Sequence, residues 1–165
     1  MSTDAIELLT NDHQQMRRMF QEFQAAGDDM TKKVKLVGQI LEALTVHTYI
    51  ENECMYPETR RLLPDLDEEI LESYEEHHVA DVLSFELAMM DPDDENFEAK
   101  TMVLIESVTH HLDEEEQEWF PTVREGLSRE QLQDIGARMV ELKKKAPRKP
   151  TAPRALQRAM AAVKA

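Results

Sequence analysis

Apolar residues recur at spacings of three and four along most of this chain, the period of an α-helix that buries one face. Turn and capping residues divide the pattern into five helices. We expect them from Asp4 to the Gly27 turn, from Thr31 to about Pro57 with a short turn continuing to Leu63, from the Pro64–Asp65 break to about Met90, from the Asp91–Asp93 turn to about Trp119, and from Ser128 into the tail. Asp4 with Glu7 and Ser128 with Gln131 are spaced as capping pairs. The pattern predicts an all-α protein, an up-down-up-down four-helix bundle with an extra C-terminal helix.

Histidines and glutamates interrupt the apolar stripes of three of these helices. The stripes are Ile6, Leu9, His13, Met16, Phe20 and Phe23 in the first helix, Val37, Ile40, Leu44, His47, Glu51 and Cys54 in the second, and Leu104, Val108, His111 and Glu115 in the fourth. Such stripes face the core of a bundle, so Glu51 and Glu115 are predicted to point inward. An unpaired buried carboxylate is costly, so it normally pairs, binds a metal ion or takes up a proton.

The chain contains an internal repeat with an offset of 64 residues. This offset places His-x3-Glu-x4-Tyr-Pro at 47–57 on His-x3-Glu-x4-Phe-Pro at 111–121, and it places His13 on His77. Each half therefore has a histidine followed 34 residues later by a His-x3-Glu pair. Residues equidistant from a turn lie at one level of an antiparallel bundle, and the midpoints between successive histidines, 30, 62 and 94, fall beside the predicted turns. The four histidines and two glutamates are predicted to converge in one layer.

A layer of four imidazoles and two carboxylates is a donor set for metal ions. His-x3-Glu places both side chains on one helix face, where they can bind one ion or bridge two. Mixed nitrogen and oxygen ligands favour iron over manganese and zinc. Six protein ligands exceed a tetrahedral zinc site and do not fill two octahedral irons, so we expect two Fe ions with an oxo or hydroxo bridge and an open position. A single core histidine is more often a packing residue, but four histidines and two glutamates in one layer argue against that interpretation.

Composition and charge limit the class of protein. With 165 residues, 4 Gly, a lone Cys54 and no apolar run approaching roughly 18 residues, we expect a single cytoplasmic domain without a disulfide or a membrane span. The net charge of −15 disfavours binding to nucleic acid. From Lys143 onward there are eight basic residues and no acidic one. We expect a folded domain over 1–145 and a basic, flexible tail over 146–165, which is solvated, contacts an anionic partner or folds back on the acidic bundle.

The pattern His…His-x3-Glu-x4-Tyr-Pro…His…His-x3-Glu-x4-Phe-Pro resembles the hemerythrin-like, or HHE cation-binding, domains over roughly residues 4–145. The resemblance implies a four-helix bundle around a non-haem di-iron centre, in which paired glutamates bridge the metals. It also implies O2, H2O2 or NO as the small-molecule ligand. Carried onto this sequence, the metal ligands are His13, His47, Glu51, His77, His111 and Glu115.

Two positions depart from the oxygen-carrying members of that family. Those proteins have His-x3-His on the third helix, where His77 is here followed by Asp81. They have His-x4-Asp on the fourth helix, where Glu116 stands in this position after His111. Glu115 matches the first half of the repeat better, and Glu116 is predicted to lie off the apolar face. The missing histidine argues against reversible oxygen carriage.

Three alternatives stay open within this interpretation. His78 is centred among the apolar positions of its helix at least as well as His77, although the repeat selects His77. Tyr74, one turn before His77, is predicted to be a core residue or a hydrogen-bond donor beside the metals. The function is that of a sensor, scavenger or weak catalase for small oxidants and gases, or iron sensing and ferroxidase-type iron handling, or an interaction module with a structural metal.

Overall fold

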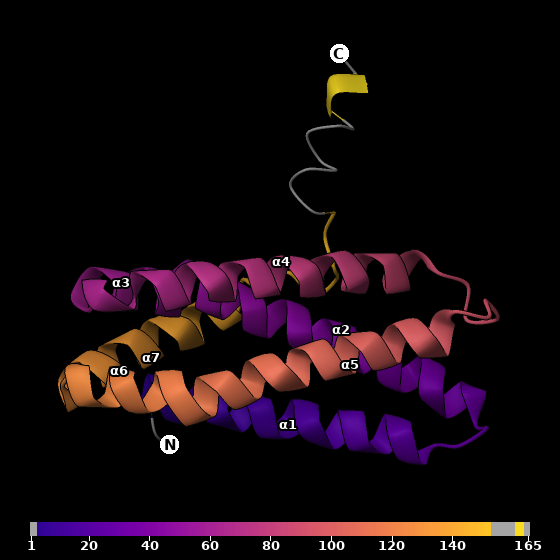
Figure 1. The fold of residues 1–165 in the computed structure, drawn as a ribbon, viewed down its shortest axis with the longest axis horizontal. Helices are drawn as coiled ribbons and strands as arrows, with labels where there is room; N and C mark the ends of the chain where they lie inside the picture. Colours follow the sequence, from indigo (N-terminus) through magenta and orange to yellow (C-terminus); the bar gives the residue numbers. More distant parts are fainter. Residues whose placement is uncertain (1–2, 153–160, 164–165) are drawn as a thin grey trace.

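The structure, a computed structural model, describes residues 3–152 and 161–163, and it contains helices and no strand in those ranges. Its four longest helices are α1 (Ala5–Ala25), α2 (Met30–Ile50), α4 (Asp67–Met89) and α5 (Phe97–Glu114). They run along the long axis in alternating directions, with the turns 26–29 and 90–96 at one end (Figure 1). At the other end lie α3 (Tyr56–Leu62), α6 (Phe120–Gly126) and α7 (Arg129–Lys143). The predicted up-down-up-down bundle with an extra C-terminal helix is confirmed.

The predicted caps begin two of these helices. The Asp4 Oδ1 accepts a hydrogen bond from the Glu7 backbone N at 3.1 Å and caps α1. At α7 the Ser128 Oγ accepts from the Gln131 N at 3.1 Å, and the Gln131 Oε1 accepts from the Ser128 N at 2.8 Å, which completes a capping box. Gly27, after α1, has a φ of 59°, in the left-handed region that side chains disfavour. Local chemistry therefore sets these helix ends as the sequence indicates.

Two π-helical turns follow the internal repeat of the sequence. They occupy Glu51–Met55 after α2 and Glu115–Trp119 after α5, and each leads into a short helix whose second residue is a proline. Pro57 and Pro121 lack an N–H and crowd the carbonyl four residues earlier. The wider turn accommodates the proline ring without ending the helix, because the residue before the proline bonds the carbonyl five residues back. The fourth helix therefore continues past its predicted end at Trp119, through α6.

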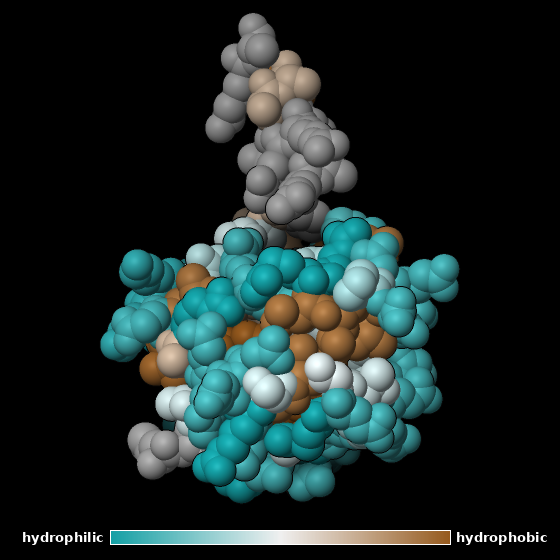
Figure 2. All heavy atoms as spheres, turned by 90° about the vertical axis from the view of Figure 1, so that its left-hand side faces the viewer, coloured by the Kyte–Doolittle hydropathy of each residue, from teal (hydrophilic) through white to brown (hydrophobic). Residues whose placement is uncertain are grey.

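Two hydrophobic clusters fill the bundle, one toward each end. Along α1, Leu9 belongs to the first cluster and Met16 to the second, and His13 lies between them. The first cluster also contains Tyr56 and Trp119 and packs where α3, α6 and α7 close the bundle. Figure 2 looks onto this end, where hydrophobic atoms surface within a hydrophilic rim. The two apolar clusters therefore enclose a polar layer near the middle of the bundle.

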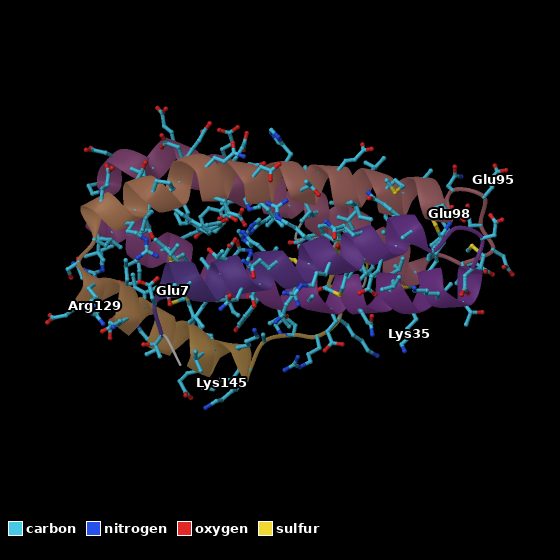
Figure 3. The ribbon with its side chains drawn as sticks, turned by 90° about the horizontal axis from the view of Figure 1, so that it is seen from below. Glu7, Lys35, Glu95, Glu98, Arg129 and Lys145 are labelled. Carbon is cyan, nitrogen blue, oxygen red and sulfur yellow. The ribbon has the colours of Figure 1, made fainter. Side chains whose placement is uncertain are left out.

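Charged side chains cover the outside of the helices. In Figure 3 the labelled side chains Lys35, Arg129 and Lys145 point away from the bundle, and these residues and Glu7 are exposed. In the part of the chain that the structure describes, no helix combines the length and the hydrophobicity that a membrane span requires.

The segment directly after α7 folds back on the bundle over residues 146–148, whereas the described residues 161–163 are exposed. Ala146 is buried, and the Arg148 Nη1 lies 3.3 Å from the Glu42 Oε1. Of the three alternatives for the tail, its first residues therefore agree with folding back on the acidic bundle. Lys149 is described, and the other three cations of the predicted tail lie outside the described residues: Arg154, Arg158 and Lys164. The domain boundary at 145/146 stays a prediction.

Close packing of α7 against the N-terminal segment gives a test of the fold. A Cβ built on Gly136 would lie 1.6 Å from the Thr3 carbonyl oxygen, so Gly136→Ala is expected to lower the free energy of unfolding by about 1–3 kcal/mol. Gly38→Ala is the matched control: this helical position has nothing within 4 Å of its Cβ, so alanine should raise stability by roughly 0.5–1 kcal/mol. Denaturant melts measure both. A stabilised Gly136→Ala variant would contradict this packing.

Candidate metal centre

The six predicted ligands meet in the layer between the two hydrophobic clusters. They come from α1 (His13), α2 (His47), α4 (His77), α5 (His111) and the first residue of each π-helical turn (Glu51 and Glu115). All six are buried, with exposed fractions from 0% to 6%. Their ligand atoms form two groups, each within 4.8 Å: His13, His47, Glu51 and Glu115 in the first, and Glu51, His77 and His111 in the second. Glu51 belongs to both groups, which is the position of a bridging ligand.

Each glutamate faces two histidines through Nε2 atoms at 3.5 Å or less, and the Glu51 Oε2 also lies 3.9 Å from the His111 Nε2. The distances from carboxylate oxygen to Nε2 are 2.8 Å for Glu51–His47, 3.0 Å for Glu51–His77, 3.5 Å for Glu115–His13 and 3.1 Å for Glu115–His111. The Glu51 contacts use different oxygens, Oε1 toward α2 and Oε2 toward α4. One carboxylate therefore spans the two halves of the repeat.

The outer nitrogen of each histidine lies against a polar side chain from another element. These Nδ1 contacts are 2.9 Å to Glu116 from His13, 3.2 Å to Asp12 from His47, 2.7 Å to Asn52 from His77 and 3.3 Å to Glu76 from His111. An oxygen at Nδ1 favours the tautomer that has its proton there and leaves the Nε2 lone pair facing inward. All four imidazoles are therefore oriented as nitrogen ligands toward one centre.

The four contacts with the outer partners form a closed ring around the bundle. In each of them, a side chain from one helix, or from the turn after it, contacts the histidine of the next long helix. An α1 side chain holds the α2 histidine, the turn after α2 holds that of α4, an α4 side chain holds that of α5, and the turn after α5 holds that of α1. Each partner is a sequence neighbour of a ligand on its own element, and the partners also repeat at the offset of 64: Asp12 with Glu76, and Asn52 with Glu116. That offset is the signal that finds them in the sequence.

Four buried, inward-facing polar atoms make no hydrogen bond of good geometry in the described part of the chain, although they face each other in pairs: His13 Nε2 with Glu115 Oε1, and His47 Nε2 with Glu51 Oε1. They belong to the four residues of the first ligand group. In the second group, the Nε2 atoms of His77 and His111 lie 3.1 Å apart, where two lone pairs repel unless a proton or a cation lies with them. Buried acceptors without donors are costly, and a metal cation satisfies them. The residues present therefore fit a metal centre.

The electrostatics of the layer favour positive charge. Burial by itself lowers the pKa of His47, but the charge of Glu51 and the hydrogen bonds to Asp12 and Glu51 outweigh it and raise that pKa to about 10. Burial likewise opposes protonation of His111, but Glu115 and Glu51 raise its pKa to about 12. Burial raises the pKa of Glu51, but the charge of His47 and the hydrogen bonds from the histidines bring it well below its ordinary value. Protons or metal ions balance the buried carboxylate, so binding of a metal releases protons.

Tyr56 is a residue of this site that the sequence interpretation left without a role. Its hydroxyl donates to Glu51 Oε2 at 2.7 Å and also lies 3.1 Å from Glu115 Oε2, 3.1 Å from His77 Nε2 and 3.3 Å from His111 Nε2. Burial, with the charges of Glu115 and Glu51, raises the pKa of Tyr56 well above its ordinary value, so the hydroxyl keeps its proton. A signal for this role was present in the repeat: Tyr56 in the first copy stands where the second copy has the apolar Phe120, so only the first copy has a hydroxyl at this position.

The structure separates the neighbouring candidates that the sequence left open. His77 is buried in the layer, whereas His78 is exposed. The Tyr74 hydroxyl donates to the Asn52 backbone carbonyl at 3.2 Å, and its ring packs edge-on against Tyr56 at 5.3 Å between centroids. Tyr74 therefore supports Tyr56 and the segment carrying Asn52. Asp81 lies in a surface groove with His78.

Comparisons with known proteins agree with this site. Residues 4–123 match the family described as Hemerythrin HHE cation binding domain. A solved structure of a hemerythrin HHE cation binding domain-containing protein from Mycobacterium kansasii superposes with a TM-score of 0.72 and 20% identity over 86% of each chain, which is a likeness of fold.

Two curated relatives match by sequence. An uncharacterized hemerythrin-like protein of Schizosaccharomyces pombe is 26% identical over 142 residues, covering 86% of this chain and 70% of that protein. A protein of Nostoc sp. named DNA nickase is 28% identical over 127 residues, covering 77% of this chain. The chain spans about a third of the Nostoc protein, 35% of its length.

Glu116 is partly exposed, as expected for a residue off the apolar face, but it belongs to the ring of outer partners, a role that the sequence analysis did not give it. Since its Oε1 holds the Nδ1 of His13, Glu116→Ala is expected to weaken metal binding about 10- to 100-fold, as loss of an outer partner of a ligating histidine does elsewhere. Competition titration with Co²⁺ measures the affinity. Glu125→Ala, an exposed glutamate on α6, is the control and should bind as the wild type does. Equal affinity of the two variants would contradict the role of the ring.

Proposed function

Because the chain belongs to the Hemerythrin HHE cation binding domain family, we propose that its buried layer is a non-haem di-iron centre that binds or reacts with small oxidants or gases, namely O2, H2O2 or NO. The observation that carries the proposal is the position of Glu51 in both ligand groups. A carboxylate shared by two groups of imidazole ligands suits two ions with a common bridge better than one isolated ion.

The types of the ligand residues support iron as the metal, and their number supports an open coordination position. Four nitrogen and two carboxylate ligands favour iron over manganese and zinc. Two octahedral ions need more donors than these six residues supply, so positions stay available for an external ligand. When bound, the two irons would supply redox chemistry and the site at which a small molecule attaches.

The chain's own contribution would be to orient the ligands, donate a hydrogen bond and exclude bulky molecules. The ring of outer partners holds the four imidazoles, and the Tyr56 hydroxyl supplies a proton donor at the inner face of the carboxylates. The cavity that reaches His111 and Glu115 has a volume of about 180 Å³, below that of pockets for drug-sized ligands, so it admits small molecules and not a bulky substrate. These features favour reaction with a small oxidant or gas over turnover of a large substrate.

Sensing, scavenging or weak catalase activity fits this site better than oxygen carriage. Asp81 stands where the carriers have a further histidine, and it lies in the outer groove beside His78. One nitrogen ligand fewer leaves one more position for an external ligand, which favours reaction over reversible binding. Ferroxidase-type sites are built on Glu-x-x-His pairs, whereas this chain has His-x3-Glu.

We propose no action on DNA and a cytoplasmic location. The nicking activity in the name of the Nostoc relative belongs to a protein of which this chain spans 35%. The net charge of −15 repels a phosphate backbone. The lone cysteine, Cys54, is buried and fits a reducing compartment.

Metal analysis tests the di-iron assignment. Protein loaded with Fe²⁺ and freed of excess is expected to retain about two irons per chain. His77→Ala should retain about one, because His77 belongs to one ligand group, and Glu51→Ala should retain less, because Glu51 belongs to both. His78→Ala removes the exposed neighbouring histidine and should bind as the wild type does. A wild-type content of one zinc and no iron would overturn the assignment.

Rapid mixing tests the reactivity. Reduced, iron-loaded protein mixed in turn with O2, H2O2 and NO is expected to change its absorption spectrum with at least one of the three. His47→Ala should show no such change, because it removes a ligand of the first group, whereas His78→Ala should react normally. If iron-loaded wild type responded to none of the three, the metal would be structural and the interaction-module hypothesis would replace this one.

A further inference from the structure

An acidic pocket connects the surface with the candidate metal centre. It is the cavity of about 180 Å³ between α4 and the end of α5. Five glutamates form its walls, Glu69, Glu72 and Glu76 on α4 with Glu114 and Glu118 across from them, and a sixth lies in its floor. His111, Glu115 and Trp119 are its buried floor. Among the described residues that line the pocket, none is Lys or Arg, so the pocket presents one sign of charge.

A group of three possible metal ligands stands at the opening of the acidic pocket. Ligand atoms of Glu76, His110 and Glu114 lie within 4.8 Å of one another, and the His110 Nε2 is 2.9 Å from the Glu114 Oε1. His110 is exposed, while the two glutamates are partly buried. The Glu76 Oε1 also lies 3.3 Å from the His111 Nδ1. Glu76 therefore touches both the outer group and a residue of the buried centre.

The floor of the acidic pocket contains buried polar atoms without hydrogen-bond partners. In the described part of the chain these are the Trp119 Nε1 and the Glu115 Oε1, and their residues have exposed fractions of 6% and 2%. Such atoms normally have a partner from solvent or a ligand. The pocket is therefore polar down to the Glu115 carboxylate, which a metal ion could reach without crossing an apolar barrier.

Two other cavities approach the layer, and neither offers the same route. A cavity of about 10 Å³ beside Thr48, Val108 and Leu112 is too small for a hydrated ion. A wider groove reaches His77 between His78 and residues 147–152, but the outer nitrogen of that histidine is already held by Asn52. Of the three, the acidic pocket combines width, carboxylates and direct contact with Glu115.

We propose that the acidic pocket is the route by which divalent cations, Fe²⁺ in the proposed protein, reach the buried centre, and that Glu76, His110 and Glu114 bind the cation first. The proposal rests on the proposed function, because an access route requires a metal centre behind it. A cleft lined by one sign of charge raises the local concentration of the opposite ion and the rate of its association. Exchange of water for carboxylate and imidazole at the outer group lets the ion lose its hydration stepwise. The same field repels anions, whereas O2, H2O2 and NO are uncharged.

Kinetics of metal uptake test this route with a built-in reporter. The chain has one tryptophan, Trp119 on the pocket floor, so its fluorescence follows the arrival of a quenching ion. Metal-free full-length protein is mixed with Co²⁺ in a stopped-flow instrument at low and high ionic strength. The test variant carries Glu69→Gln, Glu72→Gln and Glu118→Gln, none of which is a ligand of the centre. The control carries Glu22→Gln, Glu95→Gln and Glu130→Gln, exposed residues outside the pocket with the same change of net charge.

The test variant is expected to take up Co²⁺ about tenfold more slowly at low ionic strength and to lose most of the salt dependence, while its final metal content stays at the wild-type value. The control should load at the wild-type rate. His110→Ala, an exposed change with no effect on the core, should also slow uptake because it removes a ligand of the outer group. Equal rates in the test variant, His110→Ala and the control would overturn the route and leave the metal centre intact. Absence of Co²⁺ and Fe²⁺ binding in the wild type would instead overturn the proposed function.

Discussion

The burial of two carboxylates in the middle of an apolar helical bundle is the constraint on which this structure depends. Glu51 and Glu115 have exposed fractions of 0% and 2%, and they lie between two hydrophobic clusters. Charges in that position require positive partners of good geometry, since the desolvation cost is otherwise not recovered. Each carboxylate faces two imidazole nitrogens, and Glu51 extends to both ligand groups. The layer is thereby a site for cations before any particular metal is considered.

The ring of outer partners couples this layer to the arrangement of the helices. Every histidine is held at Nδ1 by a side chain from a neighbouring element, and the four contacts close around the bundle. Rotation of one helix, or a shift by one residue, would break a contact on each side of it. The helix packing and the orientation of the ligands are therefore one property of the fold, as a preorganised metal site requires.

The π-helical turns join the site to its surroundings. Each begins at a glutamate that is a candidate metal ligand and accommodates a proline, and the widened turn after α2 places Tyr56 over the carboxylate five residues before it. Turns of this kind are frequent at functional sites. The acidic pocket between α4 and the end of α5 reaches Glu115 and His111. The centre thus has a donor hydroxyl inside and a negatively charged opening outside, which suits uptake of cations and passage of small uncharged molecules.

The sequence by itself determined the helices, their caps and the six residues of the layer. The periodicity of apolar residues shows which face of each helix is buried, and the distance of a residue from a turn gives its height along the bundle. The repeat at an offset of 64 residues applies both arguments to each half of the chain. Tertiary packing decided the rest. His77 and His78 differ by one position on α4, and only the rotation of that helix against its neighbours buries the first and exposes the second. Tyr56 is off the face of Glu51 in a regular α-helix, and the π turn brings it back. The contact of Glu116 with His13 joins residues 103 positions apart, so it depends on which helices are neighbours, and local periodicity contains no information about that.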